Sequence, residues 1–181
     1  GDIDTVLTPY DSIRYYKHFL QTGLLSVDAE TGQVKAWVGG INYKHFQFDH
    51  VKQGKRQVGS TFKPFVYATA INQLHISPCD NFPNTPYTIP SGKYGLIEDW
   101  TPKNSSNRYG GMLNLKSALA NSVNVITANL IDQVTPQNVI TLANNLGIES
   151  KIPNAPSIAL GSLDLSIYEM VGALNTFTNK G

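Results

Sequence analysis

The sequence has few charged residues and only one cysteine, and each shortage excludes a class of protein. Charged residues are 15% of the 181 positions, and the formal net charge is +1. Nucleic-acid-binding arms and disordered tails show charge runs or a strong basic excess, so we expect no nucleic-acid partner. The single cysteine, Cys79, cannot form a disulfide within the chain and fits no metal-ligand spacing. We expect it to be a small buried hydrophobic residue.

Long apolar runs are also missing. No stretch approaches the roughly 20 apolar residues that cross a bilayer, and the acidic start, Gly1-Asp2-Ile3-Asp4, does not resemble a signal peptide. Hydrophobic residues nevertheless make up 41% of the chain, which is enough to build a core at this length. Length and composition therefore predict one domain covering residues 1–181.

The order of apolar segments predicts an N-terminal hairpin followed by a mostly helical body, an α+β fold. Apolar runs on both sides of a glycine-containing turn at residues 29–33 are typical of a β-hairpin. We assign residues 1–22 to a lead-in or linker, 23–40 to the hairpin and 60–181 to the helical body. Residues 41–58 show no clear period and are expected to form a loop.

Capping residues mark the expected ends of several helices. Asn114 can cap one helix, and Thr135, followed by a proline, can cap another that ends at the glycine Gly147. Ser166 and Glu169 have the spacing of a capping box at the start of the last helix, which we expect to end near residue 181.

Ser60 and Lys63 form the clearest chemical feature. Residues three positions apart lie on one face of a helix, so the amine can reach the hydroxyl. A serine hydroxyl is a poor nucleophile unless a nearby base takes its proton. Lysine can serve as that base when burial lowers its pKa, and Phe62 and Phe65 supply apolar surroundings. The spacing alone also fits a helix cap beside a solvent-facing lysine.

Ser122 and Asn124, at the junction of two predicted helices, form a second candidate pair. A hydroxyl there can relay a proton, and an amide can hold a lysine or a substrate amide group. The string Ser-Ser-Asn at 105–107 has the same pattern, but it lies in a long polar loop over 77–111 without apolar periodicity, so we reject it. Ordinary cap and turn chemistry is the alternative interpretation for both strings.

Longer segments around these pairs match one family of enzymes. The segments are 56–65 around Ser60, 100–104 (Trp-Thr-Pro-Lys-Asn), 115–124, the hairpin segment 31–40 and residues 159–181. Together with Ser-x-x-Lys and Ser-x-Asn, they resemble the transpeptidase domain of class A penicillin-binding proteins. The resemblance covers nearly the whole chain.

The resemblance implies a fold and a reaction. The fold would be that of serine β-lactamases and transpeptidases, and the reaction peptidoglycan D,D-transpeptidation through an acyl-serine intermediate. Ser60 would be the nucleophile and Lys63 its base, while Ser122 and Asn124 would place and relay protons. No metal or organic cofactor is implied. The implied partners are stem peptides ending in D-Ala-D-Ala and β-lactam antibiotics. The parent protein would be membrane-anchored, with an upstream glycosyltransferase domain, at the periplasmic face of the inner membrane.

One departure from the family pattern is the absence of Lys-Thr-Gly or Lys-Ser-Gly. In the family this motif lies on a later strand that supplies half of the oxyanion hole. The resemblance therefore implies a partial domain without its C-terminal sheet strands. We expect such a chain, on its own, to be weak or inactive as an enzyme.

Two other functions stay open. A β-lactamase needs a base that activates water for deacylation, and only Glu149 and Glu169 follow the second motif. Glu169 is assigned to the capping box, and Val123 stands where those enzymes commonly have Asp. A non-catalytic β-lactam sensor or binding domain, by contrast, can share the nucleophile motif.

Overall fold

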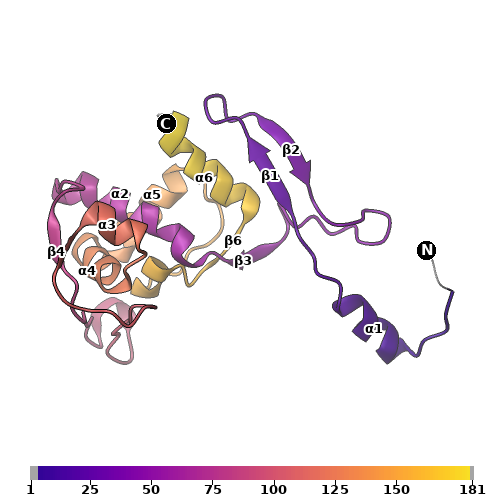
Figure 1. The fold of residues 1–181 in the computed structure, drawn as a ribbon, viewed down its shortest axis with the longest axis horizontal. Helices are drawn as coiled ribbons and strands as arrows, with labels where there is room; N and C mark the ends of the chain where they lie inside the picture. Colours follow the sequence, from indigo (N-terminus) through magenta and orange to yellow (C-terminus); the bar gives the residue numbers. More distant parts are fainter. Residues whose placement is uncertain (1–3, 180–181) are drawn as a thin grey trace.

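The computed structural model describes residues 4–179, which form a helical body with an extended N-terminal arm (Figure 1). In the arm, helix α1 (Pro9–Lys17) leads to the antiparallel hairpin of β1 (Leu24–Val27) and β2 (Val34–Val38). The hairpin lies where the sequence predicts one. Helix α1 was not predicted, although Thr8 caps it and a proline follows at its first position.

Short strand pairs link the helices of the body. The helices are α2 (Lys63–Leu74), α3 (Leu115–Ala120), α4 (Asn124–Val134), α5 (Pro136–Asn145) and α6 (Ile167–Asn179), with 3₁₀ turns η1 (Gly59–Phe62), η2 (Lys93–Gly95) and η3 (Pro156–Leu160). The strand pairs are β3 (Lys55–Gln57) with β6 (Asp164–Ser166), and β4 (Asn81–Pro83) with β5 (Met112–Asn114). This mixture confirms the α+β class. The expected end of the last helix near residue 181 lies outside the described residues. Within residues 4–179, no helix is long and apolar enough to cross a membrane.

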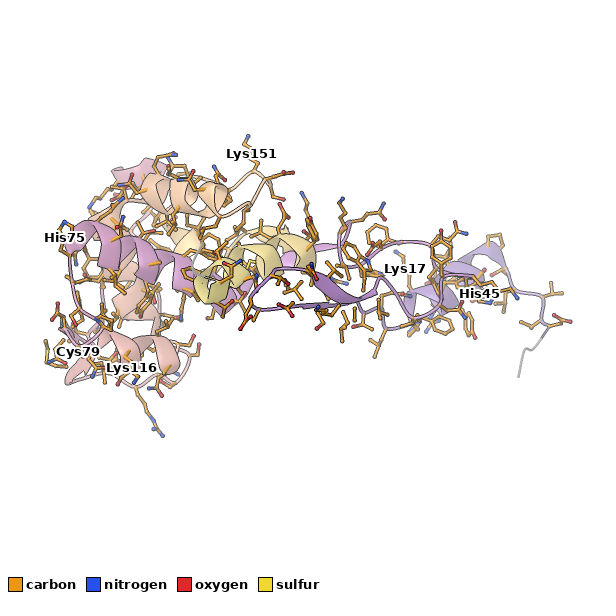
Figure 2. The ribbon with its side chains drawn as sticks, turned by 90° about the horizontal axis from the view of Figure 1, so that it is seen from above. Lys17, His45, His75, Cys79, Lys116 and Lys151 are labelled. Atoms are coloured by element: carbon orange, nitrogen blue, oxygen red, sulfur yellow. The ribbon has the colours of Figure 1, made fainter. Side chains whose placement is uncertain are left out.

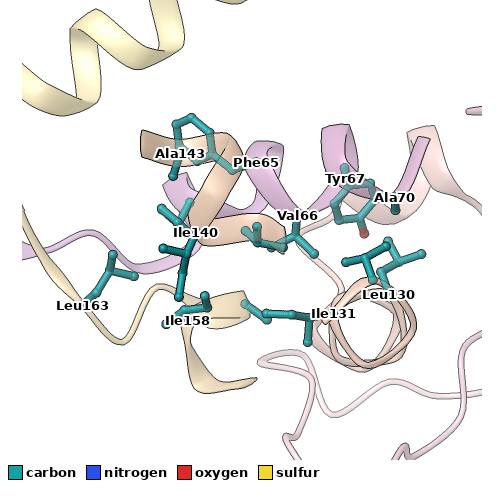
Figure 3. Packing of buried hydrophobic residues seen from close by; sticks show 14 of the residues in the cluster. Phe65, Val66, Tyr67, Ala70, Leu130, Ile131, Ile140, Ala143, Ile158 and Leu163 are labelled. Atoms are coloured by element: carbon teal, nitrogen blue, oxygen red, sulfur yellow. The ribbon is translucent and has the colours of Figure 1, made fainter. Parts of the chain in front are cut away.

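Helix α2 is the centre of the core because apolar residues occupy several of its faces. Its Phe65, Val66 and Ala70 are fully buried. Figure 3 shows them facing side chains from α4, α5 and η3, including Leu130, Ile131, Ile140, Ala143 and Ile158. Each fully buried Val, Leu, Ile or Phe side chain contributes about 1.5–3 kcal/mol. The core therefore fixes the position of the helix that carries Lys63.

The hairpin rests on the helical body through α6. The Trp37 ring lies 5.8 Å from the Tyr168 ring, and the Lys52 amine lies over that same ring at 5.5 Å. Elsewhere on the hairpin, the side chains of Val34 and Val38 are about half exposed. A two-stranded hairpin is marginal in water, so these contacts with α6 stabilise it.

Three of the predicted helix ends are confirmed by their hydrogen bonds or dihedral angles. Asn114 Oδ1 accepts the Ser117 amide at 2.8 Å, and Gly147 has φ +93° just after α5. In the capping box, the Ser166 amide donates to Glu169 at 3.1 Å, and the Glu169 amide donates to the Ser166 hydroxyl at 3.2 Å. Burial raises the pKa of Glu169, but hydrogen bonds from the 150 and 166 positions outweigh it and lower the pKa to about 2.

Two local predictions are wrong. Helix α5 begins at Pro136 as expected, but Thr135 has φ +71° and makes no capping bond with its side chain. A capping residue normally has extended backbone angles with negative φ, which Thr135 lacks. Cys79 is exposed, not buried. It sits in a turn closed by the carboxylate of Asp80 at the edge of the body (Figure 2), where no apolar neighbour covers it.

Two segments expected to be loops contain short strands. Strand β3, in the segment 41–58, pairs with β6. In the segment 77–111, β4 pairs with β5, and Ile89 and Trp100 form an isolated bridge. Three-residue strands are too short to show an alternating pattern. Their partners, far away in the sequence, are what order them.

Candidate active site

Ser60 lies on the 3₁₀ turn η1, and Lys63 is the first residue of α2. The prediction placed both in the first turn of one helix, so the local geometry differs. Strand β3 ends just before, and Gly59 has φ +56°, which leaves only a short, tight turn before α2. Such turns are frequent at helix starts. Ser60 itself is exposed, so a substrate can reach its hydroxyl.

Gly161 holds the backbone in front of Ser60. The amide of Gly59 donates to the Gly161 carbonyl at 3.1 Å, and the Val58 amide donates to the Leu163 carbonyl at 3.0 Å. A Cβ on Gly161 would lie 1.8 Å from the Gly59 oxygen, and Gly161 has φ +75°. Only glycine fits this approach. The residues after η3 therefore fix where the turn η1, which carries Ser60 and is called the nucleophile turn below, begins.

Ser122 occupies a strained position at the end of α3. Its φ is +53°, a left-handed conformation that costs a residue other than glycine about 1–2 kcal/mol. Its amide donates to Leu119 and that of Val123 donates to Ala118, at 3.0 and 2.9 Å. This is the Schellman pattern, in which glycine usually takes the left-handed site. Ser122 keeps its hydroxyl there, and the hydroxyl faces Ser60.

Three polar atoms surround the Lys63 amine. It donates to the carbonyl of Ser122 at 2.7 Å, to the Ser122 hydroxyl at 2.8 Å and to Asn124 Oδ1 at 2.7 Å. The residue is only 1% exposed, and burial lowers its pKa from 10.5 to about 8. Apolar neighbours such as Phe62, which is fully buried, account for that environment, as the sequence suggested.

The two predicted pairs meet through one hydrogen bond. The Ser122 hydroxyl donates to the Ser60 hydroxyl at 3.0 Å, and the same oxygen contacts the Lys63 amine. The amine therefore lies within about 6 Å of the Ser60 hydroxyl, in reach of a relay through one group. The amine thus reaches the Ser60 hydroxyl through Ser122, and the helix junction that carries Ser122 faces Ser60.

The rejected string at 105–107 lies elsewhere. Its residues are exposed, and the amide of Asn107 donates to the carbonyl of Asn104 in a local turn. Among the described residues, the hydroxyl bonded to Ser60 is that of Ser122. Of the two strings, the one at 122–124 is therefore the one that the fold brings to Ser60.

Asn104 joins the site although no role was assigned to it from the sequence. Its side chain accepts the amides of Asn124 and Val125, and Asn124 Nδ2 in turn donates to the carbonyl of Lys103 at 2.8 Å. The only sequence signal was its place in the segment 100–104. Within residues 4–179, no three His, Cys, Asp or Glu side chains gather as a metal site would require.

Comparison with known families identifies this arrangement. A model of the penicillin-binding protein transpeptidase domain matches residues 22–181. The chain belongs to this family. A model of the penicillin-binding protein middle domain matches residues 1–20, the segment assigned above to a linker.

Relatives of this transpeptidase-family chain include penicillin-binding protein 1A of several bacteria. The protein from Aquifex aeolicus is 35% identical over 164 residues, covering 90% of this chain and 22% of the relative. That from Neisseria gonorrhoeae is 35% identical over 165 residues, covering 90% and 20%. The chain thus spans about a fifth of the length of these curated relatives.

Solved penicillin-binding proteins share the fold. Penicillin-binding protein 1A from Haemophilus influenzae superposes with a TM-score of 0.79 at 28% identity, covering 87% of this chain and 23% of that one. PonA1 from Mycobacterium tuberculosis, in complex with penicillin V, gives 0.70 at 24% identity, covering 92% and 46%. The second likeness concerns the fold alone. The arrangement of helices and small sheets is therefore that of the transpeptidase family.

Proposed function

We propose that this chain carries the acylation machinery of a peptidoglycan D,D-transpeptidase. Ser60 Oγ attacks the carbonyl of the penultimate D-alanine of a stem peptide. The new ester bond forms as the peptide bond to the last D-alanine breaks, and that D-alanine leaves with a proton. The amine of a second stem peptide then attacks the ester: the new amide bond forms the cross-link, the ester bond to Ser60 breaks, and a proton lost by the attacking amine restores the Ser60 hydroxyl.

The observation that carries the proposal is the chain of hydrogen bonds from Ser60 through Ser122 to Lys63. A hydroxyl can accept and donate at once. A proton can therefore pass from Ser60 to Ser122 while the proton of Ser122 passes to the amine. Two further groups around the amine complete the case.

The carbonyl of Ser122 and the amide oxygen of Asn124 can only accept hydrogen bonds from Lys63. A neutral amine has two N–H donors and one lone pair. When its donors point to these two oxygens, the lone pair points to the Ser122 hydroxyl. In this neutral state the Ser122 hydroxyl turns its proton from Ser60 to the amine and accepts the proton of Ser60 instead, so the basic electron pair lies along the relay. Asn124 has this positioning role in the proposal, and Ser122 has the relay role.

The same machinery would react with β-lactams, because their ring amide is an acyl donor for a serine. The proposed partners are stem peptides ending in D-Ala-D-Ala and β-lactam antibiotics. We place the parent protein in the bacterial cell envelope, anchored to the inner membrane. Its periplasmic part would contain this domain and an upstream glycosyltransferase domain. The relationship to penicillin-binding protein 1A supports this assignment.

The contacts of the two glutamates favour a transpeptidase over a β-lactamase. Both oxygens of Glu169 accept bonds from Ser150 and Ser166, and its lowered pKa makes it a weak base. Glu149 is exposed and lines a polar surface cavity with Glu169, Lys52 and Lys55, away from Ser60. Neither glutamate is bonded to a group of the relay, so neither is placed to activate water at Ser60.

The test is covalent labelling by a fluorescent penicillin. We expect the full-length protein to acquire one adduct, located on Ser60 by mass spectrometry, and the Ser60→Ala variant to remain unlabelled. The 181-residue chain, measured beside it, is expected to label more slowly. Incorporation of labelled D-amino acids into peptidoglycan by the full-length protein checks the transfer step.

Three outcomes would contradict the proposal. An adduct that forms equally in Ser60→Ala would remove Ser60 as nucleophile. Rapid turnover of a chromogenic cephalosporin would indicate a β-lactamase. Stable labelling without any D-amino acid incorporation would indicate a sensor or binding domain.

The acylation rate should depend on pH through Lys63. Only the neutral amine accepts a proton, so with a pKa of about 8 the rate is expected to rise about tenfold per unit below pH 8 and then level off. Gel-based labelling over the range from about pH 6 to about pH 10, corrected with Ser60→Ala, measures this. A rate that stays constant across pH 8 would contradict the assignment of Lys63 as base.

The same pKa difference determines whether the free energy of unfolding rises or falls with pH. The unfolded lysine has the ordinary pKa of 10.5 and the folded one about 8, so between these values the unfolded state binds more protons. The Lys63 contribution to the free energy of unfolding therefore rises with pH from about 8 to 10.5 and is flat below.

A further inference from the structure

Helix α4 begins without a capping side chain of its own. Its first residue is Asn124 and the preceding Val123 makes no side-chain cap, although serine, threonine, aspartate and asparagine are strongly preferred at that position. The first amides of a helix have no partner within the helix. At α4 these amides sit beside the reacting groups, because Asn124 bonds directly to Lys63. Their partner therefore affects the site.

Asn104, distant in sequence, supplies the missing cap. Its Oδ1 accepts the amide of Asn124 at 2.9 Å and that of Val125 at 3.2 Å. Its Nδ2 donates to Asn84 Oδ1 at 2.9 Å and to the Arg108 carbonyl at 3.0 Å. The side chain is only 4% exposed, and two bonds at each end use its hydrogen-bonding capacity fully. Its position and its amide orientation are both fixed.

The residue before Asn104 fixes the orientation of Asn124. The carbonyl of Lys103 accepts from Asn124 Nδ2 at 2.8 Å, and a carbonyl cannot donate. Asn124 must therefore turn its other end, Oδ1, to the Lys63 amine. If the amide were reversed, Nδ2 would face the amine, and two donors would meet. The 103–104 peptide thus determines which group Lys63 encounters.

The segment that carries Asn104 is also anchored at the other end of α4. Tyr87 donates to Asp132 Oδ2 at 2.8 Å, and the Lys93 amine lies 2.6 Å from Asp132 Oδ1. Tyr94 donates to the Asp132 carbonyl at 2.9 Å. Contacts at both ends of one helix hold the segment in register along α4. Asn104 is therefore presented to the site by a rigid support.

We propose that Asn104 is a positioning residue for the acylation step, which caps α4 and, with the Lys103 carbonyl, holds the Asn124 amide oxygen on the Lys63 amine. This rests on the proposed function, since it assigns Lys63 the part of base. No charged group acts on the amine within this network. The side chains of Lys103 and Arg108 are exposed, and these residues contribute only their carbonyls.

The experiment compares Asn104→Ala with Asn114→Ala in the full-length protein. Asn114 caps α3 by the same kind of bond, to the Ser117 amide, so the matched control loses a cap but none of the contacts to Asn124. Both variants are expected to lower Tm by about 2–5 °C. Only Asn104→Ala is expected to slow acylation by fluorescent penicillin. At a pH high enough for the rate to have levelled off, the loss should be about tenfold or more, with the initial affinity for penicillin nearly unchanged.

Two further readouts separate positioning from stability. Asn104→Asp keeps an acceptor oxygen for α4, and we expect it to recover most of the acylation rate at high pH while its charge moves the pH midpoint upward. The titration of Lys63, followed by NMR of labelled lysine side chains, should move upward in Asn104→Ala, because water enters the vacated space and solvates the ammonium. The Asn114→Ala titration should match that of the unsubstituted protein.

The proposal is overturned if Asn104→Ala loses Tm as Asn114→Ala does but keeps the acylation rate and the Lys63 titration. If Asn104→Ala does not fold, Asn84→Ala takes its place, because it removes only one partner of Asn104 Nδ2. It is expected to act in the same direction, and an unchanged rate and titration would then overturn the proposal. If the unsubstituted protein is never acylated, the proposed function fails, whereas the NMR titration still decides the role of Asn104.

Discussion

Replacing Lys63 with methionine is expected to lower the rate of Ser60 acylation by about 10²–10⁴-fold. Methionine is unbranched and fits a buried apolar site, but its thioether sulfur is only a weak hydrogen-bond acceptor and not a base for the proton that Ser122 relays. It also leaves the Ser122 carbonyl and Asn124 Oδ1 without the donor they now share. Stopped-flow measurement of penicillin binding and acylation separates the two steps, and the loss should fall on acylation.

The matched control for this variant is Lys116→Met. Lys116 is an exposed lysine on α3 that extends away from the body (Figure 2), so it undergoes the same substitution without touching the relay. We expect its acylation rate to stay within about twofold of the unsubstituted protein. A Lys63→Met variant that acylates as fast as Lys116→Met would mean that another group takes the proton of Ser60.

Replacing Gly161 with alanine is expected to destabilise the fold by about 3–5 kcal/mol. The left-handed backbone at φ +75° accounts for about 1–2 kcal/mol of this. The remainder comes from the new Cβ, which would lie 1.8 Å from the Gly59 oxygen and must push the two backbones apart. Because Ser60 follows Gly59, the acylation rate should fall as well. Urea unfolding and penicillin labelling measure the two effects.

Gly95→Ala isolates the conformational part of that loss. Gly95 has the same φ, +75°, but nothing within 4 Å of an added Cβ. We expect it to cost only about 1–2 kcal/mol and to leave acylation unchanged. Equal losses of stability in the two variants would show that the close approach between Gly161 and Gly59 does not constrain the nucleophile turn.

Local sequence patterns were sufficient to find the two residue pairs that the structure brings together. Ser60 with Lys63, and Ser122 with Asn124, are each defined by short spacing and by the apolar residues around them. The Ser166 capping box was predicted because its two partners are three residues apart. Interactions between near neighbours leave a signal in the sequence itself.

The tertiary structure alone decided how these pairs are supported. Ser122 adopts a left-handed backbone angle that serine does not favour, so its residue type predicts a right-handed or extended backbone there. Asn104 reaches α4 from 20 residues away, and β3 is a strand only because β6 pairs with it. Cys79 shows the same limit, since its type favours burial while its turn lies at the surface.

The sequence by itself therefore determined which residues are candidates for the chemistry: a serine, a lysine, and a second serine and asparagine, each recognisable within three or four positions. Only the tertiary structure decided that Ser122 lies 3.0 Å from Ser60, that Asn104 caps the helix of Asn124, and that Gly161 holds the nucleophile turn. The physical reason is that hydrogen bonds and close contacts between distant segments depend on how the core packs, which no short stretch of sequence encodes.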